Sequence, residues 1–276
     1  NVSIRKAFKQ YANVRPVVSY APFVENHFPQ NFDVTIVREN EEDLYAGIEY
    51  RQSGGIYHAI KILSEGGTRR IVEYAFEYAV KNNRKKVTCM TKDNIMKVTD
   101  GMFHRIFNEI GERYPQIEKE HYIIDIGTAR LANAPYHFDV VVTLNLYGDI
   151  VSDVVAEVSG SVGLAGSGNI GMKYSMFEAI HGSAPTMAGQ NRANPSGLLN
   201  GAIMMLAHIG RGSIAAKIQN ALLYTLEQGI VTPDLAKTET AKQAKTIVGT
   251  SEFADEVIKN LGKVPAKLKP VSYKDF

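Results

Sequence analysis

The sequence predicts an α/β fold, because segments rich in β-branched residues alternate with segments of helical periodicity. The 276 residues are 45% hydrophobic and 22% charged, which is enough apolar material for one large domain or for two lobes. A glycine-dense stretch, residues 160–171, divides the chain. Strand and helix patterns alternate before it, and helix patterns dominate after it. If the chain forms two lobes, we therefore expect it to cross from one to the other in this stretch.

The expected strands all precede the glycine-dense stretch. They are Asp33–Val37, Lys86–Met90, His121–Ile124 and Phe138–Leu144. Two helices are expected between them, with Thr68 as the cap of the first and Thr99 as the cap of the second. Their apolar faces should be buried, and they consist of Ile71, Tyr74, Ala75 and Tyr78 in the first helix and Met102, Phe103, Ile106, Phe107 and Ile110 in the second. Three more helices are expected near Asn194–His208, Ser213–Glu227 and Ser251–Leu261.

Composition excludes several classes of protein. The formal net charge of +2 is close to neutral for this length, and the basic residues are scattered, so nucleic acid is not expected as a main partner. The most apolar window starts at Leu198 but contains Asn200 and His208, which favours a core helix over a membrane span. Cys89 is the only cysteine, so an intrachain disulfide and a cysteine zinc site are excluded and a reducing compartment is expected.

The stretch GSGNIG, residues 166–171, spells the G-x-G-x-x-G pattern of dinucleotide-binding folds. A working fingerprint follows a strand, opens a helix and has an acidic residue about 20 positions further on. The preceding residues, AEVSGSVGLA, do not have a strand pattern, and residues 186–196 contain no Asp or Glu. We therefore reject the fingerprint and expect a flexible loop whose backbone amides can still approach a cofactor.

Acidic residues suggest a metal site after two of the strands. If a helix begins near Asp149 in NLYGDIVSDVVAE, Asp149 and Asp153 lie at positions i and i+4 of one face, and their oxygens suit magnesium or manganese. The alternative is that Asp149 caps the helix and Asp153 is only solvated. Asp125 in IIDIG follows another strand. It is either a third carboxylate at the same sheet edge or a turn former.

Arginines and two other polar residues complete the candidate site. Arg5, Arg15 and Arg38 lie near strand ends and suit a substrate with several carboxylates, although surface arginines are the ordinary alternative. Tyr45 in DLYAG and Lys92 in TKDNIMK can transfer protons if burial or a nearby cation shifts their pKa values. Otherwise Tyr45 belongs to the core and Lys92 to the surface.

Six motifs occur together along the chain: NVSIRKAFKQYANVRP, VRENEEDLYAGIE, TKDNIMK, NLYGDIVSD, GSGNIG and FEAIHGSAPTMAGQNRANPSG. Their order and spacing resemble the isocitrate/isopropylmalate dehydrogenase family of metal-dependent decarboxylating dehydrogenases, from Asn1 to about Leu261. The version ENEEDLYAGIE resembles the isocitrate members more than the isopropylmalate members.

The resemblance implies two lobes with a mixed sheet and not a classical Rossmann fold. Residues 1–10 and 160–276 would form a large, nucleotide-side lobe that is incomplete. Residues 11–159 would form a small lobe, with a dimerisation clasp at about 46–68. The family's substrate motif begins two residues before Asn1, and a segment that contacts the nicotinamide lies further upstream, so we expect a longer enzyme.

The implied reaction is the metal-dependent oxidative decarboxylation of isocitrate to 2-oxoglutarate, a step of the tricarboxylic acid cycle. A homodimer with shared active sites is implied, because Lys92 and Asp125 come from a different subunit than the rest of each site. The implied roles are substrate binding by Asn1, Arg5, Arg15 and Arg38; proton transfer by Tyr45 and Lys92, with the Lys92 or Asp149 region accepting the hydroxyl proton; and Mg²⁺ or Mn²⁺ binding by Asp125, Asp149 and Asp153.

The resemblance also implies a nicotinamide cofactor. Its contacts would come from the segment at residues 164–171 and from FEAIHGSAP, with the cofactor-binding residues Gly168, Asn169, Ile170, Glu178, His181, Gly182, Ala184 and Asn194. After HG-[ST]-A-P, NADP-using relatives have Lys-Tyr and NAD-using relatives have Asp-Ile, whereas this chain has Thr186-Met187. We favour NAD, with NADP as the alternative, because loss of the phosphate contact should weaken NADP binding more.

Three other functions stay open. One is the same chemistry on a related 2-hydroxy acid, namely isopropylmalate, homoisocitrate or tartrate. Another is a non-catalytic regulatory subunit of a heteromeric NAD isocitrate dehydrogenase, against which the presence of Tyr45, Lys92 and the three aspartates argues. The last is a binding protein that shares the fold. The expected location is the cytoplasm, as in bacteria, or the mitochondrial matrix, with no membrane partner.

Overall fold

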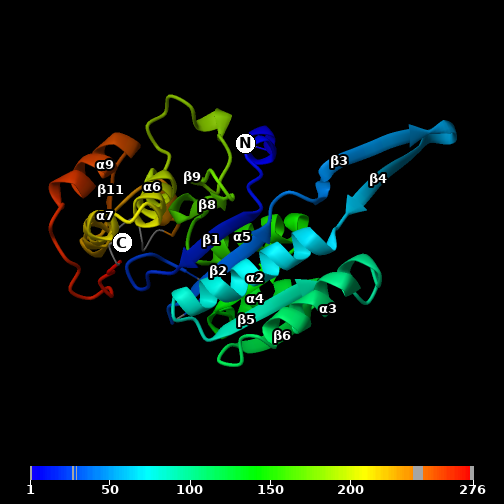
Figure 1. Ribbon diagram of the computed structural model, residues 1–276. Helices are drawn as coiled ribbons and strands as arrows, with labels where there is room; N and C mark the ends of the chain where they lie inside the picture. Colours follow the sequence, from blue (N-terminus) through cyan, green and yellow to red (C-terminus); the bar gives the residue numbers. More distant parts are fainter. Residues whose placement is uncertain (1, 27, 29, 239–244, 274–276) are drawn as a thin grey trace. The chain divides into compact units, whose positions relative to one another are not determined.

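The computed structural model describes residues 2–26, 28, 30–238 and 245–273 (Figure 1). The chain divides into two compact units. The first comprises Asn1–Arg15, Asp33–Val155 and Asn169–Ser175, and the second comprises Pro16–Phe32, Ala156–Gly168 and Met176–Phe276. The assignment of residues 1–10 and 160–276 to a nucleotide-side lobe and of residues 11–159 to a small lobe stays a prediction.

The strands form one large sheet and two small ones. In chain order they are β1 (Ala12–Val18), β2 (Asp33–Glu39), β3 (Asp43–Gln52), β4 (Ile56–Ile62), β5 (Lys86–Thr91), β6 (Glu118–Ile123), β7 (Val140–Thr143), β8 (Gly166–Ile170), β9 (Met176–Ala179), β10 (Ile230–Val231) and β11 (Thr246–Ile247). The large sheet has the order β6-β5-β7-β2-β1-β8-β9. Strands β6, β5, β7 and β2 are parallel neighbours, in the register Thr91 with Ile123 and Arg38 with Thr143. The link from β8 to β9 is too short for a parallel crossover, so the sheet is mixed.

The α-helices in the described residues are α1 (Val2–Ala7), α2 (Glu65–Lys81), α3 (Thr99–Gly111), α4 (Ile124–Asn133), α5 (Asn145–Val158), α6 (Ser196–His208), α7 (Gly212–Glu227) and α9 (Thr250–Lys259). All four expected strands and all five expected helices along the chain are present, with shifted ends. Both expected caps are wrong. Helix α2 begins earlier, where the Ser64 side chain accepts a hydrogen bond from Gly67 N, and Thr68 is buried inside the helix. Thr99 is the first residue of α3 and not its cap.

The core of the first unit confirms the predicted helix faces. The predicted residues Ile71 and Ala75 of α2 and Phe103 and Phe107 of α3 pack in one buried cluster with sheet residues such as Val140. Phe76, which was not predicted, belongs to the same cluster. Helix α4 packs against strand β5, where Gly127 lies against the Met90 side chain. Strands β3 and β4 form an antiparallel hairpin that projects away from the rest of this unit (Figure 1).

In the second unit, helices α6, α7 and α9 surround an apolar cluster that includes Leu222, Val231 and Phe253. The stretch GSGNIG does not form the expected flexible loop. Its residues Gly166–Ile170 form the buried strand β8. A Cβ atom on Gly166 would lie 2.6 Å from the backbone nitrogen of Gly201, so glycine allows α6 to pack directly on this strand. Helix α5 and a 3₁₀ turn precede β8, which confirms the rejection of the fingerprint. Among the described residues, no helix has both the length and the apolar character needed to cross a bilayer.

Candidate active site

The parallel strands of the first unit carry five candidate residues to one edge of the sheet. Arg38 lies near the end of β2, Lys92 follows β5, and Asp125 lies in the first turn of α4 after β6. Helix α5 follows β7 and carries Asp149 and Asp153. This helix begins at Asn145 and not near Asp149, so the capping interpretation of Asp149 is wrong, while the i, i+4 spacing on one face remains.

The carboxylate of Asp149 is the centre of the candidate site. Its Oδ1 atom accepts hydrogen bonds from Arg15 Nη1 at 3.1 Å and from Arg38 Nη1 at 2.5 Å, and its Oδ2 atom accepts one from the Tyr45 hydroxyl at 2.6 Å. Arg15 Nη1 also lies 3.8 Å from Asp153 Oδ1. Arg15 and Arg38 are 3% and 1% exposed, so the surface alternative is wrong for both.

Arg38 is fixed by its surroundings in the first unit. Its Nε donates to the backbone oxygen of Asn145 at 2.8 Å and to Asn145 Oδ1 at 3.0 Å. Its guanidinium carbon lies 4.9 Å from the centre of the Tyr45 ring. Gly148 leaves room for it, since a Cβ there would lie 2.5 Å from Arg38 Cγ. The buried Nη2 atom makes no hydrogen bond with the described residues, so this guanidinium keeps a free donor for an anion.

Arg15 is held by polar residues that the sequence analysis missed. Its Nε donates to Asn13 Oδ1 at 2.5 Å, and its Nη1 donates to Ser152 Oγ at 2.7 Å. Asn13 Nδ2 in turn donates to Asn169 Oδ1 at 2.9 Å. The sequence offered one signal for each arginine. For Arg15 it was the polar Asn13 in an otherwise apolar strand, and for Arg38 it was the glycine inside the helical segment NLYGD.

Burial and mutual charge shift the pKa values of this group. Burial, together with the charge of Arg38, lowers the pKa of Arg15 to about 10. Burial acts to raise the pKa of Asp149, but Arg38, the Tyr45 hydroxyl and Arg15 outweigh it, so that pKa is lowered. Burial and the hydrogen bond to Asp149 raise the pKa of Tyr45, whereas burial and the charge of Asp149 raise the pKa of Asp153. At neutral pH the site therefore holds an ionised Asp149 beside a protonated phenol.

The third candidate arginine lies nearby. Arg5 is 9% exposed, and its Nη1 donates to Asn40 Oδ1 at 3.4 Å. Its charge also acts to lower the pKa values of Arg15 and Arg38. Asn1, the remaining candidate for substrate binding, lies outside the described residues.

Lys92 and Asp125 form a separate pair. Lys92 Nζ donates to Asp125 Oδ1 at 2.6 Å, and this bond lowers the pKa of Asp125. Within the described part of the chain, no hydrogen bond or ion pair links this pair to Asp149. The Lys92 backbone N–H donates to Asp100 Oδ2 at 2.8 Å, which fixes the start of the segment that carries Lys92.

A buried ion cluster that the sequence analysis missed lies beside this segment. Lys61 of β4 places its Nζ 2.6 Å from Asp100 Oδ1, 3.9 Å from Asp43 Oδ1 and 4.7 Å from the centre of the Tyr147 ring. Asp100 and Asp43 are 0% and 1% exposed. Asp43 Oδ2 accepts a hydrogen bond from Leu146 N at 2.8 Å, at the start of α5. The cluster thus joins β4 of the hairpin to the segment that carries Lys92 and to the start of the helix that carries Asp149.

The cofactor candidates differ in their exposure. His181, Gly182 and Ala184 are exposed in the segment after β9, and Ala184 has a φ of +42°. Asn194 is buried: its Nδ2 donates to Asp234 Oδ2 at 3.0 Å, and its Oδ1 accepts from Ser196 N at 2.9 Å. The other candidates are in strands: Gly168, Asn169 and Ile170 in β8 and Glu178 in β9.

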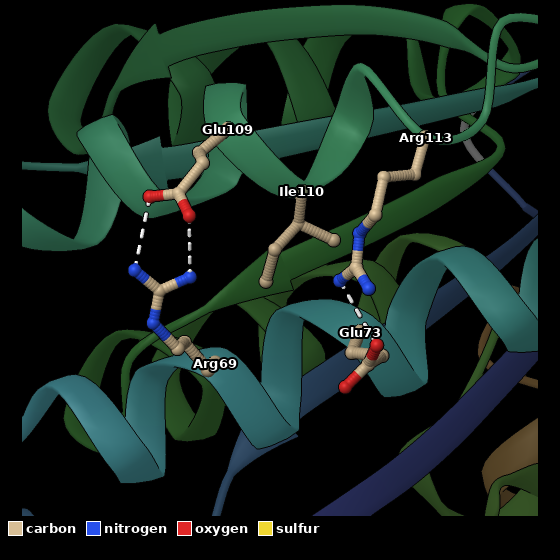
Figure 2. Close-up of a pocket in the computed structure, with 5 residues that line it drawn as sticks. All are labelled: Arg69, Glu73, Glu109, Ile110 and Arg113. Carbon is tan, nitrogen blue, oxygen red and sulfur yellow. Dashed lines mark hydrogen bonds and ion pairs between the residues drawn. The ribbon is translucent and has the colours of Figure 1, made fainter.

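A depression between α2 and α3 carries charged residues but no candidate site. Figure 2 shows Arg69 facing Glu109 and Arg113 facing Glu73, with Ile110 between them. Arg69 makes two hydrogen bonds to Glu109, at 2.7 and 3.0 Å, and Arg113 lies 2.9 Å from Glu73. The four charges are paired with one another, so they stabilise the contact between the two helices without leaving a group for a ligand.

Comparisons with known proteins show the family of the chain. Residues 1–257 match the model of the isocitrate/isopropylmalate dehydrogenase family. The chain is 62% identical over 273 residues to an isocitrate dehydrogenase (NADP) of Rickettsia bellii, covering 99% of this chain and 56% of that protein. It is 44% identical over 263 residues to a mitochondrial regulatory subunit of isocitrate dehydrogenase (NAD) from Dictyostelium discoideum, covering 95% of this chain and 71% of the relative.

A solved structure has the same fold. The chain superimposes on a protein of Thermus thermophilus with a TM-score of 0.93 and 43% identity, covering 100% of this chain and 55% of that one. The chain thus spans about half the length of the Rickettsia relative and of the Thermus protein. From the family match over most of its length and this identity to named members, the chain belongs to the isocitrate/isopropylmalate dehydrogenase family.

Proposed function

We propose that this protein catalyses the oxidative decarboxylation of isocitrate to 2-oxoglutarate, with Mg²⁺ or Mn²⁺ and a nicotinamide cofactor. The observation that carries the proposal is the convergence of Arg15, Arg38 and Tyr45 on the carboxylate of Asp149. Family membership supports it, as does the printed name of the Rickettsia relative.

The arginines would bind the substrate carboxylates. Each guanidinium can hold a carboxylate through two hydrogen bonds, and Arg38 Nη2 is a buried donor that is free among the described residues. Arg5 would supply a third positive charge. A substrate carboxylate would take over hydrogen bonds that Asp149 now accepts from Arg15 and Arg38, and this exchange would release Asp149 for its other role.

The donor set fits a hard divalent cation. Asp149 and Asp153 offer carboxylate oxygens one helical turn apart, and the lowered pKa keeps Asp149 ionised. These two residues, with Asp125 of a second copy, would hold Mg²⁺ or Mn²⁺. The bound cation would act as a Lewis acid toward the hydroxyl and the later carbonyl oxygen of the substrate.

Tyr45 would protonate the substrate carbon after carbon dioxide leaves. Its raised pKa means that the phenol holds its proton at neutral pH, as an acid must before the step. Lys92 of a second copy would assist, and the Lys92 or Asp149 region would accept the hydroxyl proton in the oxidation step.

Shared sites require a homodimer. The hairpin exposes Ile48, Tyr50, Ile56 and Tyr57, which are 45%, 53%, 51% and 72% exposed and suit a clasp with a second copy. A mixture of two inactive variants, Asp149→Asn and Lys92→Met, tests this. If sites are shared, half of the random dimers carry one intact site, and activity returns to about a quarter of the wild-type value. No return of activity on mixing argues for sites within one chain.

For the cofactor, we propose NADP, because the Rickettsia relative is named an NADP enzyme. The preference for NAD drawn from Thr186-Met187 stays a prediction from the sequence. Initial rates with NAD and NADP at matched concentrations decide between them.

The decisive assay uses purified full-length protein, Mg²⁺ and either cofactor with isocitrate, isopropylmalate, homoisocitrate or tartrate. Absence of isocitrate turnover ends the proposal, and faster turnover of another acid identifies the related enzyme. The Dictyostelium relative, named as a regulatory subunit, keeps that alternative in the test. Asp149→Asn should lower kcat at least 100-fold in a catalytic chain and should change little in a regulatory one, with the exposed Asp255→Asn as control. The expected compartment, cytoplasm or mitochondrial matrix, stays a prediction.

A further inference from the structure

A second group of possible metal ligands lies in the first unit, outside the proposed catalytic residues. It consists of Asp93 after β5, His104 of α3 and His121 of β6. His104 Nδ1 lies 2.7 Å from Asp93 Oδ2, and His121 Nε2 lies 3.8 Å from the same oxygen. The two imidazole rings are stacked, with centroids 3.6 Å apart and planes 15° apart. All three side chains are half-buried, between 19% and 27% exposed.

We propose that Asp93, His104 and His121 bind a divalent transition metal, with zinc as the best fit. Two atoms bound tetrahedrally to one zinc ion at about 2.0–2.1 Å lie about 3.4 Å apart. The distances of 2.7 and 3.8 Å bracket this value, and all three ligand atoms lie within 4.8 Å of one another. The stacked rings must rotate to bring the three atoms to bonding geometry. Two imidazoles and one carboxylate favour zinc over magnesium, which prefers oxygen ligands, and the fourth position remains open.

The charge of the group favours metal binding, because zinc binds neutral imidazole together with a carboxylate. Asp93 Oδ2 supplies the negative charge that faces both rings. The Thr91 hydroxyl lies 2.9 Å from His121 Nε2, so metal binding at this nitrogen replaces one hydrogen bond. This is a modest loss compared with a metal–nitrogen bond.

The bound metal would join three elements that meet next to Lys92. Asp93 follows Lys92 directly, so the metal would tie the segment after β5 to α3 and β6. The expected effect is structural, because it restrains this segment without adding a reacting group. The site does not rest on the proposed function, since it uses none of the residues assigned to substrate, magnesium or cofactor.

Zinc binding to untagged full-length protein tests the proposal. The protein is stripped with a chelator and then saturated with Mg²⁺ and isocitrate, so that the proposed catalytic carboxylates are occupied. Titration calorimetry should then give one zinc ion per chain, and zinc should raise Tm beyond the effect of magnesium. Cobalt in place of zinc should give the intense visible absorption of a four-coordinate site with nitrogen ligands. No zinc uptake, or a weak cobalt spectrum typical of six oxygen ligands, overturns the proposal.

Matched variants locate the ion. His104→Gln and His121→Gln should each weaken zinc binding at least about 100-fold, because each removes one of three ligands. His137→Gln, at an exposed histidine of the same unit, should leave it unchanged. If a histidine variant fails to fold, Asp93→Asn gives the same test while keeping the shape of the side chain. Unchanged zinc affinity in the folded variants shows that the metal binds elsewhere and overturns the proposal.

Discussion

Replacing Gly148 by alanine tests whether the position of Arg38 controls substrate binding. In the structure, an added Cβ would lie 2.5 Å from Arg38 Cγ and 2.7 Å from Arg38 Cβ. The first distance is about 0.9 Å shorter than the 3.4 Å at which ordinary contact begins. Gly148 is inside α5 and cannot retreat without moving the helix, so the Arg38 side chain must shift.

A shift of this size would break the hydrogen bonds that position the guanidinium. Arg38 Nε now lies 2.8 and 3.0 Å from the two oxygens of Asn145, and both distances would leave the hydrogen-bonding range. A hydrogen bond to a charged group contributes about 1.5–3 kcal/mol. Loss of one such contact to a substrate carboxylate should lower kcat/KM for isocitrate by about 10- to 100-fold.

Steady-state kinetics of Gly148→Ala and Gly101→Ala, side by side, make the measurement. Gly101 is also inside a helix, but nothing lies within 4 Å of an added Cβ there. Gly101→Ala should therefore keep wild-type kinetics and gain about 0.5–1 kcal/mol of stability from better helix propensity. If Gly148→Ala keeps a wild-type kcat/KM in the folded protein, the proposed role of Arg38 is refuted.

Three further predictions follow from titratable groups of the first unit. Lys61→Met leaves the buried Asp100 carboxylate without its cation and should lower the free energy of unfolding by about 3–5 kcal/mol. The β5 amides should then exchange their hydrogens faster in the variant, and equal protection would contradict this. Burial raises the pKa of Glu39 to about 7 from 4.5. The contribution of the protonated Glu39 to the free energy of unfolding is therefore complete below pH 4.5 and falls by roughly 3 kcal/mol as the pH rises through 7. Glu39→Gln should flatten this slope, seen as a smaller change in the urea midpoint between pH 5 and 8, and an unchanged slope would count against it. Tyr45→Phe should lower kcat by about 10²–10⁴ with little change in KM, whereas a rise in KM alone would mean that the phenol only binds substrate.

Elements with a strong sequence period were predictable. The faces of α2 and α3 follow from apolar spacing, which does not depend on where each helix starts. The same holds for Asp149 and Asp153: the helix starts four residues earlier than expected, yet the two carboxylates still share a face and both lie near Arg15. Periodicity is a property of the helix interior, whereas a boundary depends on one or two side chains.

Features decided by distant partners could not be read from the local sequence. Ser64 caps α2 in place of Thr68, and the carboxylate of Glu42, 22 residues away, holds the Ser64 hydroxyl and backbone N–H. The GSGNIG segment is glycine-rich and was expected to be flexible, but its first glycine, Gly166, allows close contact with α6. Asn13 reads as an ordinary polar residue until its partners Arg15 and Asn169 are known. In each case packing between segments outweighs local propensity.

Lys61 links two groups of candidate residues, the Asp149 group and the Lys92–Asp125 pair, between which the described part of the chain has no hydrogen bond or ion pair. Asp100 accepts the Lys92 backbone N–H, and Asp43 accepts the N–H of Leu146 at the start of the helix that carries Asp149. Both carboxylates are buried and share the single ammonium group of Lys61, so neither can move away from it without leaving an unpaired charge. Lys61 belongs to β4, one strand of the exposed hairpin. A displacement of that strand must therefore act on the start of α5 and on the Lys92 segment at once, through the same three side chains.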